Sequence, residues 1–193
     1  AFGGNANSLH IPGRAAFSAL EDARRAIARA LGATRPDEVV LTSGATEADN
    51  AAIIGLAQAA AHARRLGGAG GAQPHVVVSA IEHDAVLAPA KRLEQMGFSV
   101  TRVQPDRNGF ITVAALEQVM RPETVLVSVM AANSEVGSVQ PVAELARTAH
   151  AAGALFHTDA TQALGKVPVN VVDWGCDAAS FSAHKVGGPK GVG

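Results

Sequence analysis

Most residues that could do chemistry stand directly after short apolar runs of the chain. Five such runs, which we interpret as strands, are each followed by a cluster of polar residues. These clusters begin at Thr42, Ile81, Ala131, Thr158 and Ser182. Ligands of open parallel sheets bind beyond the carboxyl ends of the strands, so we expect the clusters to meet at one edge. The pattern predicts an active site without naming its chemistry.

Residues 42–46 (TSGAT) form an expected strand-to-helix turn. Gly44 permits a close backbone approach, and the N–H groups at the start of the following helix point at whatever lies there. Such a turn suits a phosphate group. The alternative is an ordinary N-cap in which Ser43 or Thr46 closes the helix, and that is the commoner use of these residues.

Asp159 follows a buried strand, where a carboxylate needs a cationic partner or several donors. A pyridinium N–H would supply one, and the carboxylate would keep that nitrogen protonated. A protonated ring is an electron sink for a carbanion at the α-carbon of a substrate. Alternatively, Asp159 caps a helix that begins near Thr161.

Lys185 lies just past an apolar strand, in the sequence SAHKVGGPKG. A lysine in such a cleft can form an imine and later act as a base. A solvated loop lysine is the alternative, and Lys190 is the rival candidate. His83 could stack on a flat aromatic ring and exchange a proton, or could be an ordinary hydrogen-bonded residue. The histidines expected to be ordinary are His10, His62, His75, His150 and His157.

Several functional classes are not supported. No His-Glu-x-x-His, no G-x-G-x-x-G opening a helix after a strand, and no G-x-S-x-G occurs. The single cysteine, Cys176, excludes an internal disulfide or a Cys-based metal site, and we expect it to be buried and structural. A net charge of −1 gives no case for nucleic acid or an anionic membrane as a partner.

The elements that must position these residues alternate along the chain. Expected helices cover residues 17–31, 45–65, 84–96, 112–119 and 141–152. Expected strands cover residues 38–42, 75–80, 98–103, 124–130, 154–158 and 178–182, and residues 66–74 form a Gly-rich loop. The strands are mostly apolar, as in a sheet covered on both faces. This order predicts a three-layer αβα fold with a mostly parallel, doubly wound sheet.

Five polar segments resemble, in order and spacing, the cysteine desulfurases. These belong to the class V aminotransferase group of fold-type I pyridoxal-phosphate (PLP) enzymes. The segments are residues 42–50 (TSGATEADN), 82–83 (EH), 133–137 (NSEVG), 157–162 (HTDATQ) and 180–185 (SFSAHK). The resemblance runs from Phe2 to Gly193, and residues 82–87 (EHDAVL) look closer to the iron–sulfur-cluster branch.

The resemblance implies pyridoxal 5′-phosphate as the cofactor and a role for each matched residue. Lys185 would be the Schiff-base lysine and the base at the α-carbon. His83 would stack on the ring and assist proton transfer, while Asp159 would pair with the ring nitrogen. Gln162 would hydrogen-bond the ring hydroxyl, and Asn133 would lie near the substrate carboxylate. The implied phosphate-binding residues are Ala45 (through its backbone N–H), Thr46, Ser182 and His184.

The implied reaction converts L-cysteine to L-alanine and transfers sulfur as a persulfide, for iron–sulfur cluster or thio-cofactor biosynthesis. Implied partners are a sulfur-acceptor or scaffold protein and a second copy in a homodimer, in the cytoplasm. The persulfide cysteine and the small domain would lie beyond the last residue. We therefore expect residues 1–193 to be a truncated PLP-binding large domain that is inactive alone. Alternatives are another class V enzyme, such as a selenocysteine lyase, or a non-catalytic binding or assembly module.

Overall fold

The computed structural model describes residues 3–68 and 71–193, so positions 69 and 70 of the expected Gly-rich loop lie outside the described residues. Internal contacts divide the chain into two compact units. The smaller comprises the chain up to Leu41 together with Val169–Val172, and the larger comprises Thr42–Pro168 and Asp173–Gly193. All the predicted site residues belong to the larger unit.

The smaller unit is built on helix α1, Ile11–Leu31. This helix begins earlier than the predicted Phe17, because the Nδ1 atom of His10 accepts a hydrogen bond from the N–H of Gly13 at 3.0 Å and a proline occupies the first turn. It ends at Gly32, whose φ of 72° is in the left-handed region that favours glycine. A single 3₁₀ turn, η1 (Pro36–Glu38), follows.

The larger unit contains a five-stranded sheet in the order β2-β1-β3-β4-β5, with every neighbouring pair parallel. The strands are β1 (His75–Ser79), β2 (Ser99–Val103), β3 (Thr124–Ser128), β4 (Leu155–Asp159) and β5 (Ala178–Ser180). Every residue of β1 and β3 is buried, as expected of strands covered on both faces. The sheet is parallel throughout, which confirms the predicted αβα fold.

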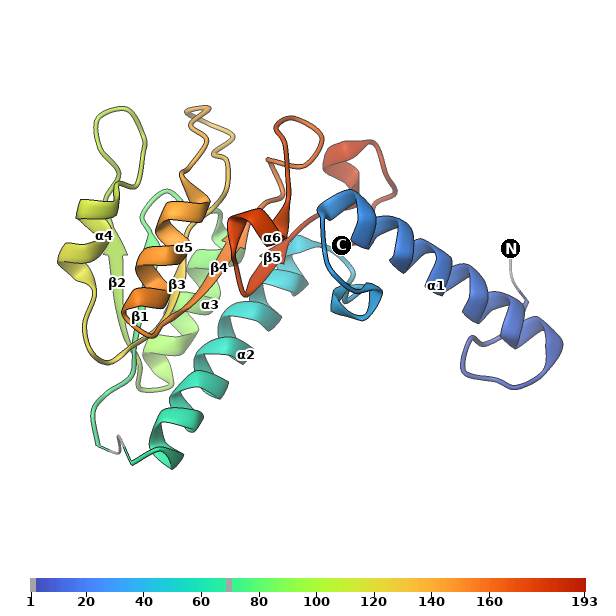
Figure 1. The fold of residues 1–193 in the computed structure, drawn as a ribbon, viewed down its shortest axis with the longest axis horizontal. Helices are drawn as coiled ribbons and strands as arrows, with labels where there is room; N and C mark the ends of the chain where they lie inside the picture. Colours follow the sequence, from blue (N-terminus) through green and yellow to red (C-terminus); the bar gives the residue numbers. More distant parts are fainter. Residues whose placement is uncertain (1–2, 69–70) are drawn as a thin grey trace. The chain divides into compact units, whose positions relative to one another are not determined.

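Helices cover both faces of this sheet (Figure 1). Helices α2 (Ala45–Leu66) and α3 (Asp84–Gln95) pack together on one face, and α4 (Val113–Val119) and α5 (Val142–Ala151) pack on the other. Two short elements, α6 (Val171–Trp174) and the 3₁₀ turn η2 (Ala183–Val186), flank β5. No helix in residues 3–68 and 71–193 has both the length and the apolar character needed to cross a bilayer.

The strand order creates a natural ligand position. The chain leaves β1 toward β2 on one side and leaves β3 toward β4 on the other, so the connections diverge between β1 and β3. Divergence of this kind opens a crevice beyond the carboxyl ends of the strands. The polar segments that follow β1, β3, β4 and β5 all leave the sheet at that edge.

One predicted strand is wrong. Residues 38–42 do not join the sheet, because Pro36 has no backbone N–H to donate and begins a 3₁₀ turn instead. Among the described residues, Thr42 alone of this segment makes a ladder-like contact, exchanging two backbone hydrogen bonds with Gly193 at 2.8 and 2.9 Å. This single pair ties the residues before α2 to the segment after β5.

Candidate functional site

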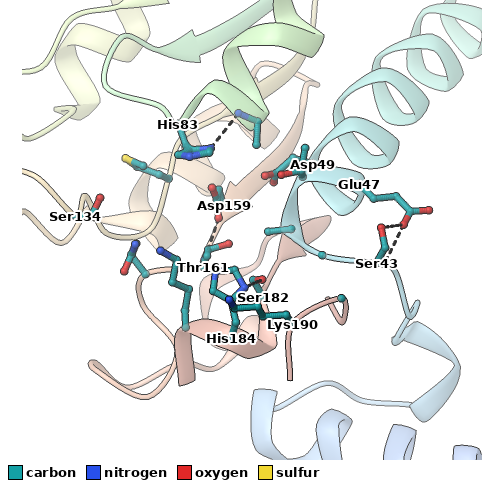
Figure 2. Close-up of a pocket in the computed structure, with 18 of the residues that line it drawn as sticks. Ser43, Glu47, Asp49, His83, Ser134, Asp159, Thr161, Ser182, His184 and Lys190 are labelled. Carbon is teal, nitrogen blue, oxygen red and sulfur yellow. Dashed lines mark hydrogen bonds between the residues drawn. The ribbon is translucent and has the colours of Figure 1, made fainter. Parts of the chain in front are cut away.

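A cavity of about 460 Å³ lies beyond the carboxyl ends of the strands (Figure 2). Its lining comes from the first turn of α2 and from the segments after β1, β3, β4 and β5. Predicted site residues in the lining are Ala45, Thr46, His83, Asp159, Gln162, Ser182, His184 and Lys185. Five separate stretches of sequence therefore meet around one space, as the polar clusters predicted.

One end of the cavity is the N-terminus of α2. Gly44 occupies the N-cap position and no side chain caps the helix, so the expected N-cap by Ser43 or Thr46 is wrong. Ser43 instead donates from its N–H and its hydroxyl to the same oxygen of Glu47, both at 2.7 Å. Within the described chain the N–H groups of Ala45 and Thr46 have no acceptor. Two donors at a helix N-terminus are thus available to an anion.

Glu47 lies in the first turn of the same helix and is engaged by Ser43. The hydrogen bonds from Ser43 hold the pKa of the Glu47 carboxyl below its usual range, so the group is ionised. Both residues belong to the cavity lining. Figure 2 shows the Ser43–Glu47 pair on the side of the cavity away from Asp159 and Ser182.

Ser182 and His184 complete this end from the segment after β5. The hydroxyl of Ser182 lies 2.8 Å from Nδ1 of His184, and Ser182 is buried. Their position depends on the Thr42–Gly193 pair, which requires a close backbone approach. A Cβ at position 193 would lie 2.5 Å from Cα of Gly44. Glycine at 193 therefore lets this segment reach the start of α2.

Asp159 forms the opposite wall of the cavity. It is the last residue of β4 and is buried, with Oδ1 accepting the N–H of Thr161 at 2.9 Å. No donor in the described part of the chain reaches its second oxygen. The helix expected near Thr161 is absent, because the residues that follow form successive turns. Asp159 therefore closes an Asx turn while one carboxylate oxygen remains available to a ligand.

Two further acids, Asp49 and Glu82, lie behind Asp159 and were missed by the sequence analysis. Asp49 is fully buried on α2, and neither of its oxygens has a hydrogen bond of good geometry. Burial and, to a smaller extent, the neighbouring Asp159 raise the pKa of Asp49, and a hydrogen bond with the Ser180 hydroxyl lowers it in part, so that the pKa is about 7. A signal was present, because buried residues recur at every fourth position of α2 from Ala45 onward.

Glu82 joins the loop after β1 to the end of β3. Its Oε1 accepts the hydroxyl of Ser79 at 2.5 Å and the N–H of Met130 at 2.6 Å, while Oε2 has no partner among the residues described. Burial raises the pKa of Glu82 to about 8; these hydrogen bonds lower it in part, and Asp159 and Asp49 raise it. Glu82 thus links the ends of β1 and β3, the two strands between which the chain connections diverge.

His157 packs among these acids but does not neutralise them. Its Nδ1 lies 2.9 Å from the hydroxyl of Ser128, and its Nε2 lies 3.0 Å from that of Ser180 and 3.5 Å from Oδ1 of Asp49. Burial lowers the pKa of His157 to about 4, so the ring is neutral around pH 7. The structure agrees with the prediction of an ordinary hydrogen-bonded histidine.

His83 and Gln162 present defined polar groups to the cavity. His83 caps α3, and its Nδ1 accepts the N–H of Ala85 at 3.1 Å, so a neutral ring carries its proton on Nε2. Gln162 accepts a hydrogen bond from Nζ of Lys166 at its carbonyl oxygen. This fixes the orientation of the carboxamide and leaves its NH₂ group as a donor.

Both lysine candidates line the cavity. Lys185 lies in η2 and Lys190 in the Gly-rich turn that follows, and both are exposed. Figure 2 shows Lys190 close to Ser182 and His184. The sequence favours Lys185, because Pro189 and Gly191 beside Lys190 suggest a turn further from the strand end. Its role as the Schiff-base lysine stays a prediction.

Asn133 and Cys176 are absent from the cavity lining, although Ala132 and Ser134 beside Asn133 belong to it. Oδ1 of Asn133 accepts the N–H groups of Glu135 and Val136, and its Nδ2 donates to the carbonyl of Ile81. Asn133 is absent from the cavity lining, so its substrate contact stays a prediction. Cys176 is half-buried rather than buried, and burial raises the pKa of its thiol to about 11. No group of three or more metal-ligating side chains occurs in residues 3–68 and 71–193.

Comparison with known proteins places this geometry in a family. Residues 2–193 match the family model described as "Aminotransferase class-V". The chain is 44% identical over 190 residues to a protein named cysteine desulfurase IscS from Dictyoglomus turgidum, and 45% identical over 192 residues to a protein of the same name from Anaeromyxobacter dehalogenans. These alignments cover 98% and 100% of this chain but 46% and 45% of the relatives.

Solved structures agree. The fold matches a structure described as "SspA in complex with cysteine", with a TM-score of 0.89, 38% identity, and coverage of 99% of this chain and 52% of that one. It also matches a "NIFS-LIKE PROTEIN", with a TM-score of 0.87, 39% identity, and coverage of 98% and 50%. The chain spans about half the length of the curated relatives it matches. From the strand order to the family match, these findings agree that this chain belongs to the class V aminotransferase family.

Proposed function

We propose that this chain is the PLP-binding large domain of a cysteine desulfurase, which converts L-cysteine to L-alanine and passes the sulfur on as a persulfide. The observation that carries the proposal is the single cavity that joins an uncapped helix N-terminus, a buried carboxylate and two lysines. The class V family is PLP-dependent, and the similar chains named IscS indicate cysteine as the substrate.

The residues present fit the cofactor. A phosphate group would be held by the N–H groups of Ala45 and Thr46, which have no other acceptor in the described structure. The side chains of Thr46, Ser182 and His184 would add donors at the same end. This assignment uses the positive end of α2, a helix of 22 residues, where an anion is stabilised.

The ring would lie between His83 and the acid wall. Asp159 would hold a proton on the ring nitrogen with its available carboxylate oxygen, and the NH₂ group of Gln162 would donate to the ring hydroxyl. His83 would stack on the ring and donate from Nε2. Bound in this way, PLP supplies an electron sink for negative charge at the substrate α-carbon.

Lys185 would carry the cofactor and move the α-proton. Its position in η2, directly after β5, places it at the sheet edge with Asp159 in the same cavity lining. Asn133 is the proposed contact of the substrate carboxylate. Such a contact requires its carboxamide to exchange at least one of its present backbone partners.

The thiol that receives sulfur is proposed to be a cysteine other than Cys176. A thiol with a pKa of about 11 is almost entirely protonated at neutral pH, whereas the thiolate is the nucleophile. Cys176 also lies outside the cavity lining. We further propose a cytoplasmic homodimer that delivers sulfur to an acceptor or scaffold protein, for iron–sulfur cluster or thio-cofactor synthesis.

The test is covalent trapping. The chain is incubated with PLP, reduced with borohydride and digested, and the modified lysine is identified by mass spectrometry. We expect the label at Lys185, its loss in Lys185→Ala and its retention in Lys190→Ala. A label at Lys190 in the unmodified chain, or no label on any cavity lysine, would contradict the proposal and favour a non-catalytic binding module.

A further inference from the structure

Three acids meet beneath the cavity, from three different elements. Asp49 comes from α2, Glu82 from the loop after β1, and Asp159 from the end of β4. The exposed fractions are 0%, 7% and 6%, so all three carboxyls are removed from water. Figure 2 shows Asp49 and Asp159 near one another beside His83. We name Asp49, Glu82 and Asp159 the acid cluster.

No cation is built into the acid cluster. The histidine that packs against Asp49, His157, is already bonded to two serine hydroxyls. His83 accepts a backbone N–H at α3. The remaining titratable residues of the described cavity lining are Glu47, which is hydrogen-bonded to Ser43, and His184, Lys185 and Lys190. Three adjacent ionised carboxyls would repel one another without a compensating charge inside the protein.

The hydrogen bonds distinguish the three members. Asp159 has a backbone donor from Thr161 and, like Asp49, lines the cavity. Both oxygens of Asp49 and Oε2 of Glu82 are enclosed and have no hydrogen bond of good geometry among the described residues, and the Ser180 hydroxyl offsets the raised pKa of Asp49 only in part. An enclosed oxygen without a donor cannot support a full negative charge, and protonation removes that cost.

We propose that Asp49 and Glu82 each keep a proton in the folded chain at pH 6, so that neither adds a negative charge beside Asp159. A cationic group bound in the cavity would then be paired with Asp159 and not with its two buried neighbours. The identification of the cationic group as a protonated ring nitrogen rests on the proposed function. The protonation states of Asp49 and Glu82 do not depend on it.

Thermal unfolding of the cofactor-free chain against pH tests the protonation states. An acid whose pKa is higher in the folded chain than in the unfolded chain loses stability as the pH rises between the two values. For Asp49 this window runs from 3.8 to about 7, and for Glu82 from 4.5 to about 8. Asn and Gln mimic the protonated acids, so the Tm of Asp49→Asn and Glu82→Gln should increasingly exceed that of the unmodified chain across these windows and then level off.

Glu117→Gln is the matched control, because Glu117 is exposed on α4 of the same unit. The difference in Tm between Glu117→Gln and the unmodified chain should not grow as the pH rises across these windows. A Tm difference for both Asp49→Asn and Glu82→Gln that stays flat, or that falls as the pH rises, would overturn the proposal. Measuring two variants keeps the test decisive if one of them does not fold.

The affinity for PLP tests whether Asp159, and not Asp49 or Glu82, pairs with a cationic group in the cavity. The dissociation constant for PLP is measured at pH 6 by the change in cofactor absorbance. Asp49→Asn and Glu82→Gln should stay within about threefold of the unmodified chain, whereas Asp159→Asn should bind at least about tenfold more weakly. Equal losses in all three variants would overturn the pairing with Asp159 alone. Failure of the unmodified chain to bind PLP would contradict the proposed function, while the Tm result would still decide the protonation states.

Discussion

The two ends of the cavity carry opposite electrostatic character and are built from different parts of the chain. At the α2 end, backbone N–H groups of Ala45 and Thr46 supply partial positive charge, and no buried ionised side chain is needed. At the acid end, the polar groups are three buried carboxyl side chains, those of Asp159, Asp49 and Glu82. The anion end thus depends on backbone geometry, whereas the acid end depends on the identity of single side chains.

The largest expected effect is at the acid end. Asp159→Asn keeps the shape of the side chain but removes the charge that would pair with a cationic ring nitrogen. Because hydrogen bonds to charged groups contribute about 1.5–3 kcal/mol, we expect PLP affinity to fall roughly tenfold to hundredfold. A spectroscopic titration measures this. Affinity within a factor of two of the unmodified chain would remove Asp159 from the ligand site.

The backbone end can be tested without changing any charged residue. Ala45→Pro removes one N–H at the first position of α2, where proline is compatible with a helix. We expect about tenfold weaker PLP binding with unchanged helix content by circular dichroism. Ala45→Gly is the control, since it keeps the N–H and should bind nearly as well. Equal losses in both variants would show that the N–H is not the contact.

Replacing glycines tests the packing that holds the α2 end of the cavity together, independently of any ligand contact. Gly193→Ala would place a methyl group 2.5 Å from Cα of Gly44, and we expect a loss of about 1–3 kcal/mol in the free energy of unfolding. Gly55→Ala, in α2 with nothing within 4 Å of the new Cβ, should instead stabilise the chain by about 0.5–1 kcal/mol. Denaturant unfolding measures the change in the free energy of unfolding for both variants. An unchanged free energy in Gly193→Ala would contradict the close approach of residue 193 to Gly44.

The smallest expected effect concerns Cys176, which lies at neither end. Because burial raises its pKa to about 11, alkylation by iodoacetamide should be slow at neutral pH and should quicken as the pH rises toward 11. Cys176→Ser should leave the PLP affinity unchanged. Rapid alkylation at pH 7 would show that the thiol is more accessible than the structure indicates.

The fold could largely be predicted because apolar runs and helical periodicity are local signals. The exceptions are informative: Pro36 begins a 3₁₀ turn and residues 38–42 do not join the sheet, and α1 gained its first residues from a cap by His10. Eight of the nine predicted site residues line the cavity. Six of them lie at or after strand ends that converge in a parallel sheet, and Ala45 and Thr46 begin α2. Asn133 does not line the cavity, since its carboxamide satisfies its own loop.

Asp49 and Glu82 could not be assigned from local pattern alone. Whether an acid is buried depends on which helix face meets the sheet, and the proximity of Asp49 to Asp159 joins residues more than a hundred positions apart. The fourth-residue spacing along α2 could have indicated burial of Asp49. No spacing in the sequence indicates that Glu82 would reach the N–H of Met130.

The measurement that tests the two-ended cavity most directly is the ratio of affinities for PLP and for pyridoxal, which lacks the phosphate. It is determined for the unmodified chain, Ala45→Pro and Asp159→Asn. We predict that Ala45→Pro lowers the ratio, because only the phosphate contact is weakened, and that Asp159→Asn weakens both ligands equally and leaves the ratio unchanged. A ratio that Asp159→Asn lowers and Ala45→Pro leaves intact would contradict this assignment of the two ends.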